Sequence, residues 1–139
     1  MPHDLRVGRV YSIPDRIAVF PDSREARAEG KGVKGTRYVV VLQDDPTVCD
    51  PNYSRVLVAP FSTREETKLG KGAVDVPFKR GEGGLTDDCY CLLGHIQPIL
   101  KTDVVNYHAP LAAARVEEIQ AIVAVVFGLL KDDAFYGLT

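Results

Sequence analysis

The chain has no tryptophan, one methionine and three cysteines. An odd number of cysteines argues against a framework of paired disulfides and favours reduced thiols. No apolar run approaches the roughly 20 residues of a membrane-spanning helix, and the N-terminus lacks the apolar stretch of a secretory signal. We therefore expect a cytoplasmic protein that makes no contact with a membrane.

An excess of positive charge is also missing. Seventeen Lys and Arg residues stand against nineteen Asp and Glu residues, which gives a formal net charge of -2. A protein with this balance does not bind nucleic acid over its whole surface, so any anion site must be a local cluster of basic residues. The 139 residues, 45% of them hydrophobic, are predicted to form a single domain over residues 1–139.

The common nucleotide-binding and hydrolase motifs are absent, because the sequence contains no GxxxxGK[ST], GxSxG or HExxH. Cys89, Cys91 and His95 could bind a metal ion, but they supply only three ligands. We expect the two cysteines to be structural thiols in a reduced core. No metal or cofactor is predicted.

Short apolar segments predict five or six β-strands. Residues 38–43 are the strongest example, a β-branched run expected to be buried on both faces. Residues 55–61 form the next strand, and the turn-forming residues between the two predict an antiparallel hairpin. The other predicted strands span residues 8–13, 73–78 (an edge strand) and 89–99 (with a bend at Gly94).

After Lys101 the pattern changes, and apolar residues recur at helical spacing. Pro110 can occupy the first turn of a helix, and the apolar positions continue to Leu130. The fold class is therefore predicted to be mainly β: a small antiparallel SH3-like barrel over about residues 7–105, with a C-terminal helix at about 110–130. One face of this helix is expected to pack on the barrel and another on a second subunit.

Basic and polar side chains gather just before the strongest strand, at the end of a charged, glycine-rich loop over residues 21–36 and directly after it. An arginine at the start of a rigid strand can contact a phosphate through two N–H groups, and nearby lysines add charge. The alternative is a solvated loop whose arginine caps the edge of a sheet. The residues concerned are Lys31, Lys34, Thr36 and Arg37.

Ser62, Thr63 and Arg64 directly follow the strand at residues 55–61. In an antiparallel hairpin the end of this strand lies beside the start of its partner, so Arg37 and Ser62 are expected to be neighbours. A cation and hydroxyl groups together at one rim can bind and activate a phosphodiester. Alone, Ser-Thr after a strand is typical of a turn.

Several segments occur in a familiar order: an early Gly-Arg-Val-Tyr, an arginine before Val-Val-Val-Leu, Val-Ala-Pro-Phe-Ser-Thr, Asp-Val-Pro-Phe, Gly-Leu, and His-Ile-Gln-Pro-Ile. This order, over roughly residues 7–130, resembles the MazF/PemK (Kid) family of toxin–antitoxin ribonucleases. The resemblance implies a homodimeric, metal-independent endoribonuclease that cleaves single-stranded RNA and thereby inhibits translation and growth. It also implies a cognate antitoxin whose acidic disordered segment covers the RNA groove.

The resemblance also implies roles for individual residues. Arg37 matches the arginine of the family, and Ser62 stands where the family usually has its catalytic threonine, with Thr63 beside it. The implied reaction is attack of a ribose 2'-hydroxyl on phosphorus, giving a 2',3'-cyclic phosphate and a 5'-hydroxyl; Arg37 would stabilise the added charge. His95, in the segment where many relatives have Gln-Ile-Arg, is the candidate general base. The candidate RNA-binding residues are Lys31, Lys34, Thr36 and Arg64.

Two other functions stay open. The first is a non-enzymatic, protein-binding toxin of the CcdB kind; such toxins depend on a tryptophan-containing C-terminus, and this chain has no tryptophan. The second is an inactive barrel that binds RNA or protein. It stays open because Tyr38 follows Arg37 where the family commonly has proline.

Overall fold

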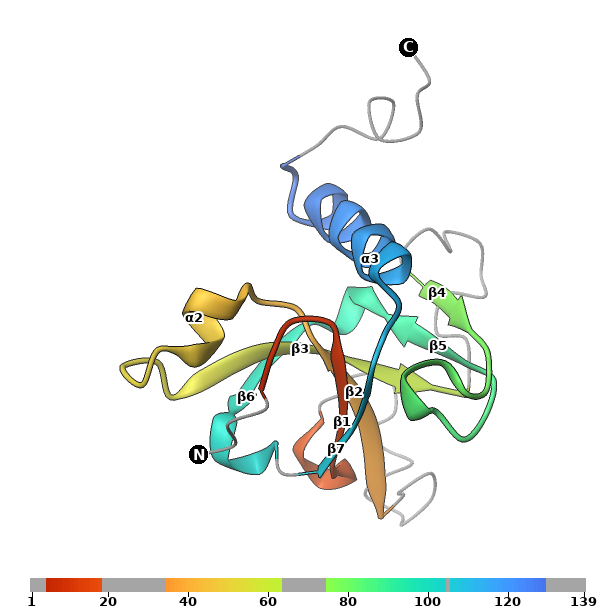
Figure 1. Cartoon of the computed structure of the whole chain (residues 1–139), viewed down its shortest axis with the longest axis horizontal. Helices are drawn as coiled ribbons and strands as arrows, with labels where there is room; N and C mark the ends of the chain where they lie inside the picture. Colours follow the sequence, from red (N-terminus) through yellow and green to blue (C-terminus); the bar gives the residue numbers. More distant parts are fainter. Residues whose placement is uncertain (1–4, 19–34, 64–74, 105, 130–139) are drawn as a thin grey trace.

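The computed structural model describes residues 5–18, 35–63, 75–104 and 106–129. These residues form seven strands, all paired antiparallel, and a C-terminal helix (Figure 1). The strands are β1 (Arg9–Pro14), β2 (Thr36–Val41), β3 (Arg55–Ser62), β4 (Asp75–Phe78), β5 (Cys89–Leu92), β6 (Gln97–Leu100) and β7 (Asn106–Pro110). The helices are α2 (Asp45–Cys49) and α3 (Ala113–Val126), and short 3-10 turns are η1 (Asp15–Ile17), η4 (Glu82–Gly84), η5 (Leu93–His95) and η6 (Lys101–Asp103).

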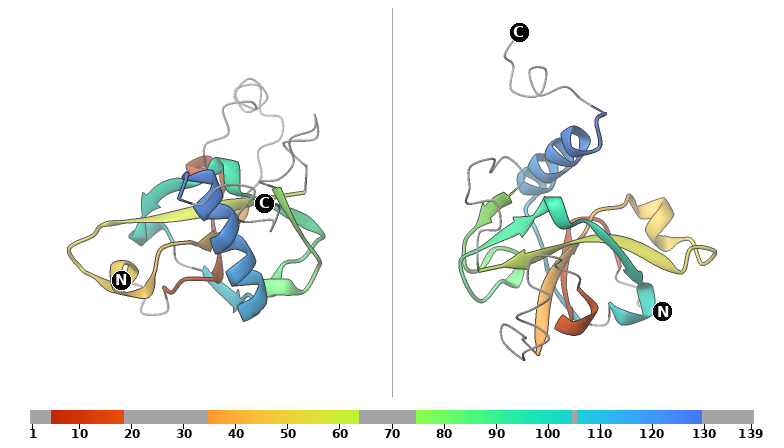
Figure 2. Two further views of the ribbon diagram at one scale, coloured as in Figure 1. Left: turned by 90° about the horizontal axis from the view of Figure 1, so that it is seen from above. Right: turned by 180° about the vertical axis from the view of Figure 1, so that it is seen from behind.

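The long strand β3 connects the two parts of the sheet. The strand order is β4-β5-β3-β2-β1-β7, and β6 pairs with the first half of β3. The middle of β3 pairs with β2, and its last two residues, Phe61 and Ser62, pair with β5. β3 therefore crosses the molecule from one part of the sheet to the other (Figure 2). The predicted small barrel is present as a bent sheet that is not closed, because the strand order ends at β4 and β7.

The turn η4 lies against β7 and β1, between the two ends of the strand order. Gly83 adopts a φ of +59°, and a Cβ atom there would come within 2.5 Å of Val10 Cγ2 and 2.9 Å of Leu111 Cδ2. Glycine is required on both counts, since it alone tolerates this backbone conformation readily and has no side chain to clash. The turn after β4 thus fills part of the opening that the sheet leaves.

Both faces of the central strands are buried, because successive side chains alternate between two apolar clusters. Val39 and Val41 of β2 pack in the cluster that contains Val48 of α2. Val40 packs in the other cluster, which contains Ile119 of α3. All three β2 valines are 0% exposed, so the prediction of a strand buried on both faces is confirmed.

The predicted strands are found with small shifts at their ends. The β2–β3 hairpin is antiparallel as expected, and the last predicted strand is divided into β5, η5 and β6, with Gly94 in η5 at the predicted bend. The segment between β2 and β3, predicted as a turn only, contains the short helix α2. In the predicted strand at residues 73–78, the first two residues lie outside the described part of the chain.

The helix α3 is shorter than predicted. Pro110 is not in its first turn but pairs with Arg9 as the last residue of β7, so that prediction was wrong. The last turn of α3 extends away from the strands (Figure 1), and Val126 and Phe127 are 38% and 55% exposed. Neither described helix has the length and apolar character needed to cross a bilayer.

Candidate functional site

Arg37 is the second residue of β2, and its guanidinium is held from two sides. Nε donates to Oδ1 of Asp15 at 2.5 Å, and Nη1 donates to the carbonyl oxygen of Phe61 at 2.8 Å. Ile13 is the register partner of Arg37, which brings the following turn η1, with Asp15, against its side chain. The two charged side chains are 8% and 0% exposed, so this is a buried ion pair that fixes the orientation of the guanidinium.

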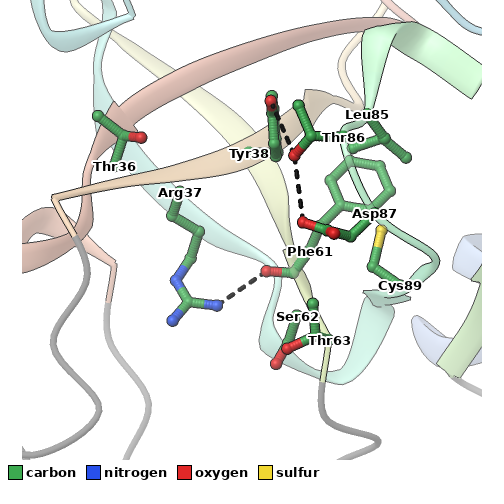
Figure 3. A pocket seen from close by; sticks show the side chains of 10 residues that line it. All are labelled: Thr36, Arg37, Tyr38, Phe61, Ser62, Thr63, Leu85, Thr86, Asp87 and Cys89. Atoms are coloured by element: carbon green, nitrogen blue, oxygen red, sulfur yellow. Dashed lines mark hydrogen bonds between the residues drawn. The ribbon is translucent and has the colours of Figure 1, made fainter. Parts of the chain in front are cut away.

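Arg37 lines a pocket of about 230 Å³ between the end of β3 and the segment before β5 (Figure 3). Ser62 and Thr63 line the same pocket, and Figure 3 shows their hydroxyl groups on the side where the guanidinium lies. The structure brings Arg37 and Ser62 together, as the antiparallel hairpin requires. The other lining residues are Thr36, Tyr38, Phe61, Leu85, Thr86, Asp87 and Cys89.

A chain of polar groups forms the other side of the pocket. The hydroxyl of Tyr38 donates to Oγ1 of Thr86 at 3.5 Å, and that hydroxyl donates to Oδ2 of Asp87 at 3.2 Å (Figure 3). None of these three residues was a predicted site residue, although Tyr38 was noted as a departure from the family. Tyr38 was hidden in an apolar run, and Thr86 and Asp87 stand in a short polar segment that carries no motif.

His95 is placed elsewhere. It belongs to η5, it does not line the pocket, and its carbonyl oxygen accepts a hydrogen bond from Nε2 of Gln97 at 2.9 Å. β5 meets β3 at Phe61 and Ser62 and then leads away from the pocket before η5 begins. Of the other predicted site residues, Lys31, Lys34 and Arg64 lie outside the described residues.

Cys89 and Cys91 lie in the apolar cluster beneath α3, 7% and 0% exposed. Burial raises the pKa of the Cys91 thiol far above its ordinary value, and the nearby Cys89 and Asp75 raise it further, so Cys91 stays a neutral thiol. Cys49 is exposed in α2, where its sulfur accepts a hydrogen bond from Nη1 of Arg6 at 2.9 Å. Over the described ranges, no three His, Cys, Asp or Glu side chains are grouped as metal ligands.

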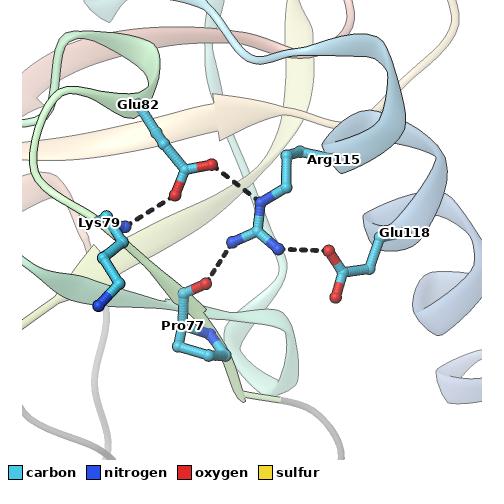
Figure 4. Close-up of polar contacts among 5 residues, drawn as sticks. All are labelled: Pro77, Lys79, Glu82, Arg115 and Glu118. Carbon is cyan, nitrogen blue, oxygen red and sulfur yellow. Dashed lines mark hydrogen bonds and ion pairs between the residues drawn. The ribbon is translucent and has the colours of Figure 1, made fainter.

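Arg115, near the start of α3, joins the helix to the edge of the sheet (Figure 4). Its Nε donates to Oε1 of Glu82 at 3.0 Å, and its other nitrogens donate to Glu118 and to the carbonyl oxygen of Pro77. The guanidinium also lies over the Phe78 ring, 3.9 Å from its centroid. These contacts mark Arg115 as a structural cation.

A second hollow adjoins the Arg37 pocket, and the two share Thr63 and Cys89 in their linings. Lys79 and Tyr90 are among its other lining residues. The two hollows are therefore neighbours near the end of β3 and the start of β5.

The family model described as PemK-like, MazF-like toxin of type II toxin-antitoxin system matches residues 20–127. A search of curated proteins gave no sequence match. Three similar solved structures are an endoribonuclease in complex with its cognate antitoxin from a mycobacterial species, the Mycobacterium tuberculosis toxin MazF-mt6, and MazE-MazF from Deinococcus radiodurans.

These three structures share the fold of the chain at low sequence identity. The mycobacterial endoribonuclease is 13% identical with a TM-score of 0.63, and the match covers 91% of this chain and 97% of that one. MazF-mt6 is 22% identical with a TM-score of 0.55, covering 67% and 87%. The Deinococcus structure is 14% identical with a TM-score of 0.59, covering 89% and 95%.

Proposed function

Because the chain belongs to the family of PemK-like, MazF-like toxins of type II toxin–antitoxin systems, we propose that it is an endoribonuclease that cleaves single-stranded RNA in the Arg37 pocket. The observation that carries this proposal is the arrangement of the pocket, where a fixed guanidinium lies beside the hydroxyl groups of Ser62 and Thr63. One of the similar structures, from a mycobacterial species, is described as an endoribonuclease, which supports the same activity here.

The proposed reaction is a transesterification at phosphorus. The ribose 2'-oxygen forms a bond to phosphorus while the bond from phosphorus to the 5'-oxygen breaks, which leaves a 2',3'-cyclic phosphate and a 5'-hydroxyl. Arg37 stabilises the negative charge that builds up on the non-bridging oxygens, because a guanidinium keeps its proton and is oriented before the substrate arrives. Ser62 and Thr63 donate hydrogen bonds to the same phosphate.

This reaction needs a group that accepts the proton of the 2'-hydroxyl and one that returns a proton to the 5'-oxygen. Asp87 supplies the carboxylate among the residues that line the pocket, so we assign it the role of proton acceptor. Solvent water returns a proton to the 5'-oxygen as it leaves. His95, which was the candidate from the sequence, stays a prediction that would need the ring to reach the pocket from η5.

We propose that the protein acts as a homodimer and that an acidic antitoxin segment silences it. Two of the similar structures contain an antitoxin or its MazE equivalent, which supports such a partner. The exposed apolar residues Val126, Phe127 and Leu129 at the end of α3 support a subunit contact there. Lys31, Lys34, Thr36 and Arg64 are proposed to hold the RNA strand around the pocket.

The decisive experiment incubates the purified protein with single-stranded RNA oligonucleotides in the presence of a chelator and maps both ends of each product. We expect 5'-hydroxyl and 2',3'-cyclic phosphate ends. Arg37→Lys keeps the charge but loses the planar fork of donors, and it should lower kcat by about 100-fold or more.

The neutral variant must be chosen with the ion pair in mind. Arg37→Ala alone leaves Asp15 buried without its cation, at a cost of about 3 kcal/mol or more, so lost activity could reflect lost folding. The double variant Asp15→Asn/Arg37→Gln removes both charges and is the better probe. If this variant is folded by circular dichroism and still cleaves RNA at the original rate, Arg37 has no role in the reaction. If the original protein cleaves no RNA in the panel, the inactive alternative is favoured.

A further inference from the structure

Next to the Arg37 pocket, three polar and aromatic side chains meet from three neighbouring strands. They are Tyr38 of β2, Ser12 of β1 and His108 of β7. Ser12 and Tyr38 are register partners, whereas His108 is the extra residue of a bulge, because Tyr11 pairs with Tyr107 and Val10 with Ala109. A bulge re-aims side chains on its strand, and here the His108 ring meets Tyr38.

The contacts hold the exposed imidazole in a defined position. Nε2 of His108 and Oγ of Ser12 are hydrogen-bonded at 3.0 Å, and Ser12 is only 6% exposed. The His108 and Tyr38 rings meet edge to face, with centroids 4.9 Å apart and an angle of 69° between their planes. A solvent-exposed histidine is thus fixed by a buried hydroxyl on one strand and a tyrosine on another.

The same cluster is joined to the pocket by the last residue of η4 and the segment that follows it. A Cβ atom at Gly84 would lie 3.0 Å from Cβ of His108, so this backbone passes directly against the histidine. Two residues later Thr86 accepts the hydrogen bond of Tyr38, and Tyr38 itself lines the pocket (Figure 3). Tyr38 therefore belongs both to the pocket and to the aromatic corner beside it.

We propose that Tyr38 and His108 form a nucleobase subsite, which takes the base of a nucleotide that flanks the phosphate in the Arg37 pocket. This inference rests on the proposed function and adds a determinant of sequence preference to it. Unpaired bases of single-stranded RNA are bound by stacking on aromatic side chains and by hydrogen bonds to their edges. A ring that is already held by Ser12 loses little conformational freedom when a base stacks on it.

The test compares His108→Ala with the original protein on two RNAs that differ at one nucleotide. One RNA carries the preferred base beside the cleavage point, and the other is abasic at that nucleotide. Loss of one stacked base corresponds to roughly a tenfold decrease in affinity or more. We expect His108→Ala to lower kcat/KM about tenfold on the first RNA and to leave the second unchanged. His108→Phe should retain most of the activity, because it keeps the stacking surface.

Asn106→Ala is the matched control, since it changes another exposed residue of β7, and it should behave as the original protein does. The subsite is refuted if His108→Ala lowers kcat/KM by the same factor on both RNAs, or if it changes neither.

A second readout separates this inference from the proposed activity. A non-cleavable oligonucleotide with 2'-deoxyribose at the cleavage point carries 2-aminopurine at the tested base, and its fluorescence is quenched by stacking. Quenching that is lost in His108→Ala and kept in Asn106→Ala supports the subsite even if the protein cleaves nothing. Equal quenching in all three proteins overturns it, even if cleavage is observed.

Discussion

At the residue scale, the buried ion pair of Arg37 and Asp15 holds the guanidinium of the pocket in place. The position of Arg37 before an apolar β-branched run marks it as a cation at the start of a buried strand, and the hairpin places it near Ser62. Its partner was missed, because nothing in the pattern of residues 14–17 distinguishes an aspartate that folds back onto β2 from one that faces solvent. The register of β1 with β2 was the signal that could have found it.

Cys91 gives a prediction for stability at alkaline pH. Burial raises the folded-state pKa of this thiol above the ordinary value of 9.0, so in the unfolded chain the thiol ionises first as pH rises. The contribution of Cys91 to the free energy of unfolding is therefore fully present below about pH 9. Above that value it falls by up to about 1.4 kcal/mol per pH unit. Urea unfolding between about pH 8 and pH 10.5 measures this decline.

Two cysteine variants test whether Cys91 causes this decline. Cys91→Ala is expected to flatten the decline, although it lowers stability at every pH by removing buried sulfur. Cys49→Ala, which changes an exposed cysteine, is expected to show the same decline of stability with pH as the original protein. An identical alkaline decline in all three proteins would show that Cys91 does not cause it.

At the scale of elements, the sequence predicted what depends on local pattern. Buried strands such as β2 and β3 carry β-branched runs, so they were found with small errors at their ends. β7 was missed because it lies at the end of the strand order and most of its side chains are exposed, which leaves no alternation to read. Pro110 was assigned to the helix because proline suits the first turn of a helix as well as the end of an edge strand. Its pairing with β1 is a long-range contact that the local sequence does not indicate.

Arg115 provides the prediction at this scale. It attaches the first turns of α3 to Glu82 and to the backbone of β4, so Arg115→Met should weaken the docking of the helix. We expect a loss of about 1–2 kcal/mol in the free energy of unfolding, since the side chain is about a quarter exposed and its ion pairs are partly screened.

Glu117→Ala is the comparison for Arg115→Met, because it changes an exposed residue of the same helix and should cost less than about 0.5 kcal/mol. Equal midpoints in urea for Arg115→Met and the original protein would mean that the helix is held by its apolar face alone.

At the scale of the whole molecule, the pocket is assembled from segments far apart in the sequence: the start of β2, the end of β3 and the segment before β5. A fourth segment, η1, holds the arginine of the pocket through Asp15. Local patterns predicted two of these segments, the start of β2 and the end of β3, which the hairpin places side by side. The approach of Thr86 and Asp87 depends on how η4 fills the opening of the sheet, which no local pattern contains. His95, the candidate general base from the sequence, is not among the residues that line this pocket, and its proposed role stays a prediction.

The net charge of -2 leads to a prediction for RNA binding. If a local cluster of Arg37, Lys31, Lys34 and Arg64 supplies the contacts to phosphate, affinity should fall steeply with salt, with a slope of log K against log salt of about -3. Fluorescence anisotropy with a non-cleavable oligonucleotide measures this slope. An acidic peptide should displace the RNA at low salt, and affinity that does not change with salt would contradict the local-cluster model.

The buried pair of Arg37 and Asp15 also constrains how such a toxin can evolve. A mutation of Arg37 alone, selected because it inactivates the toxin, removes the proposed active-site charge. It also removes the buried ion pair that stabilises the folded chain. Such a protein is expected to be cleared by proteolysis, so it would not persist to occupy an antitoxin. Substitutions at Ser62 or Thr63 are expected to give a folded but inactive protein that still binds the antitoxin as a decoy. Both side chains face the pocket, and neither is fully buried.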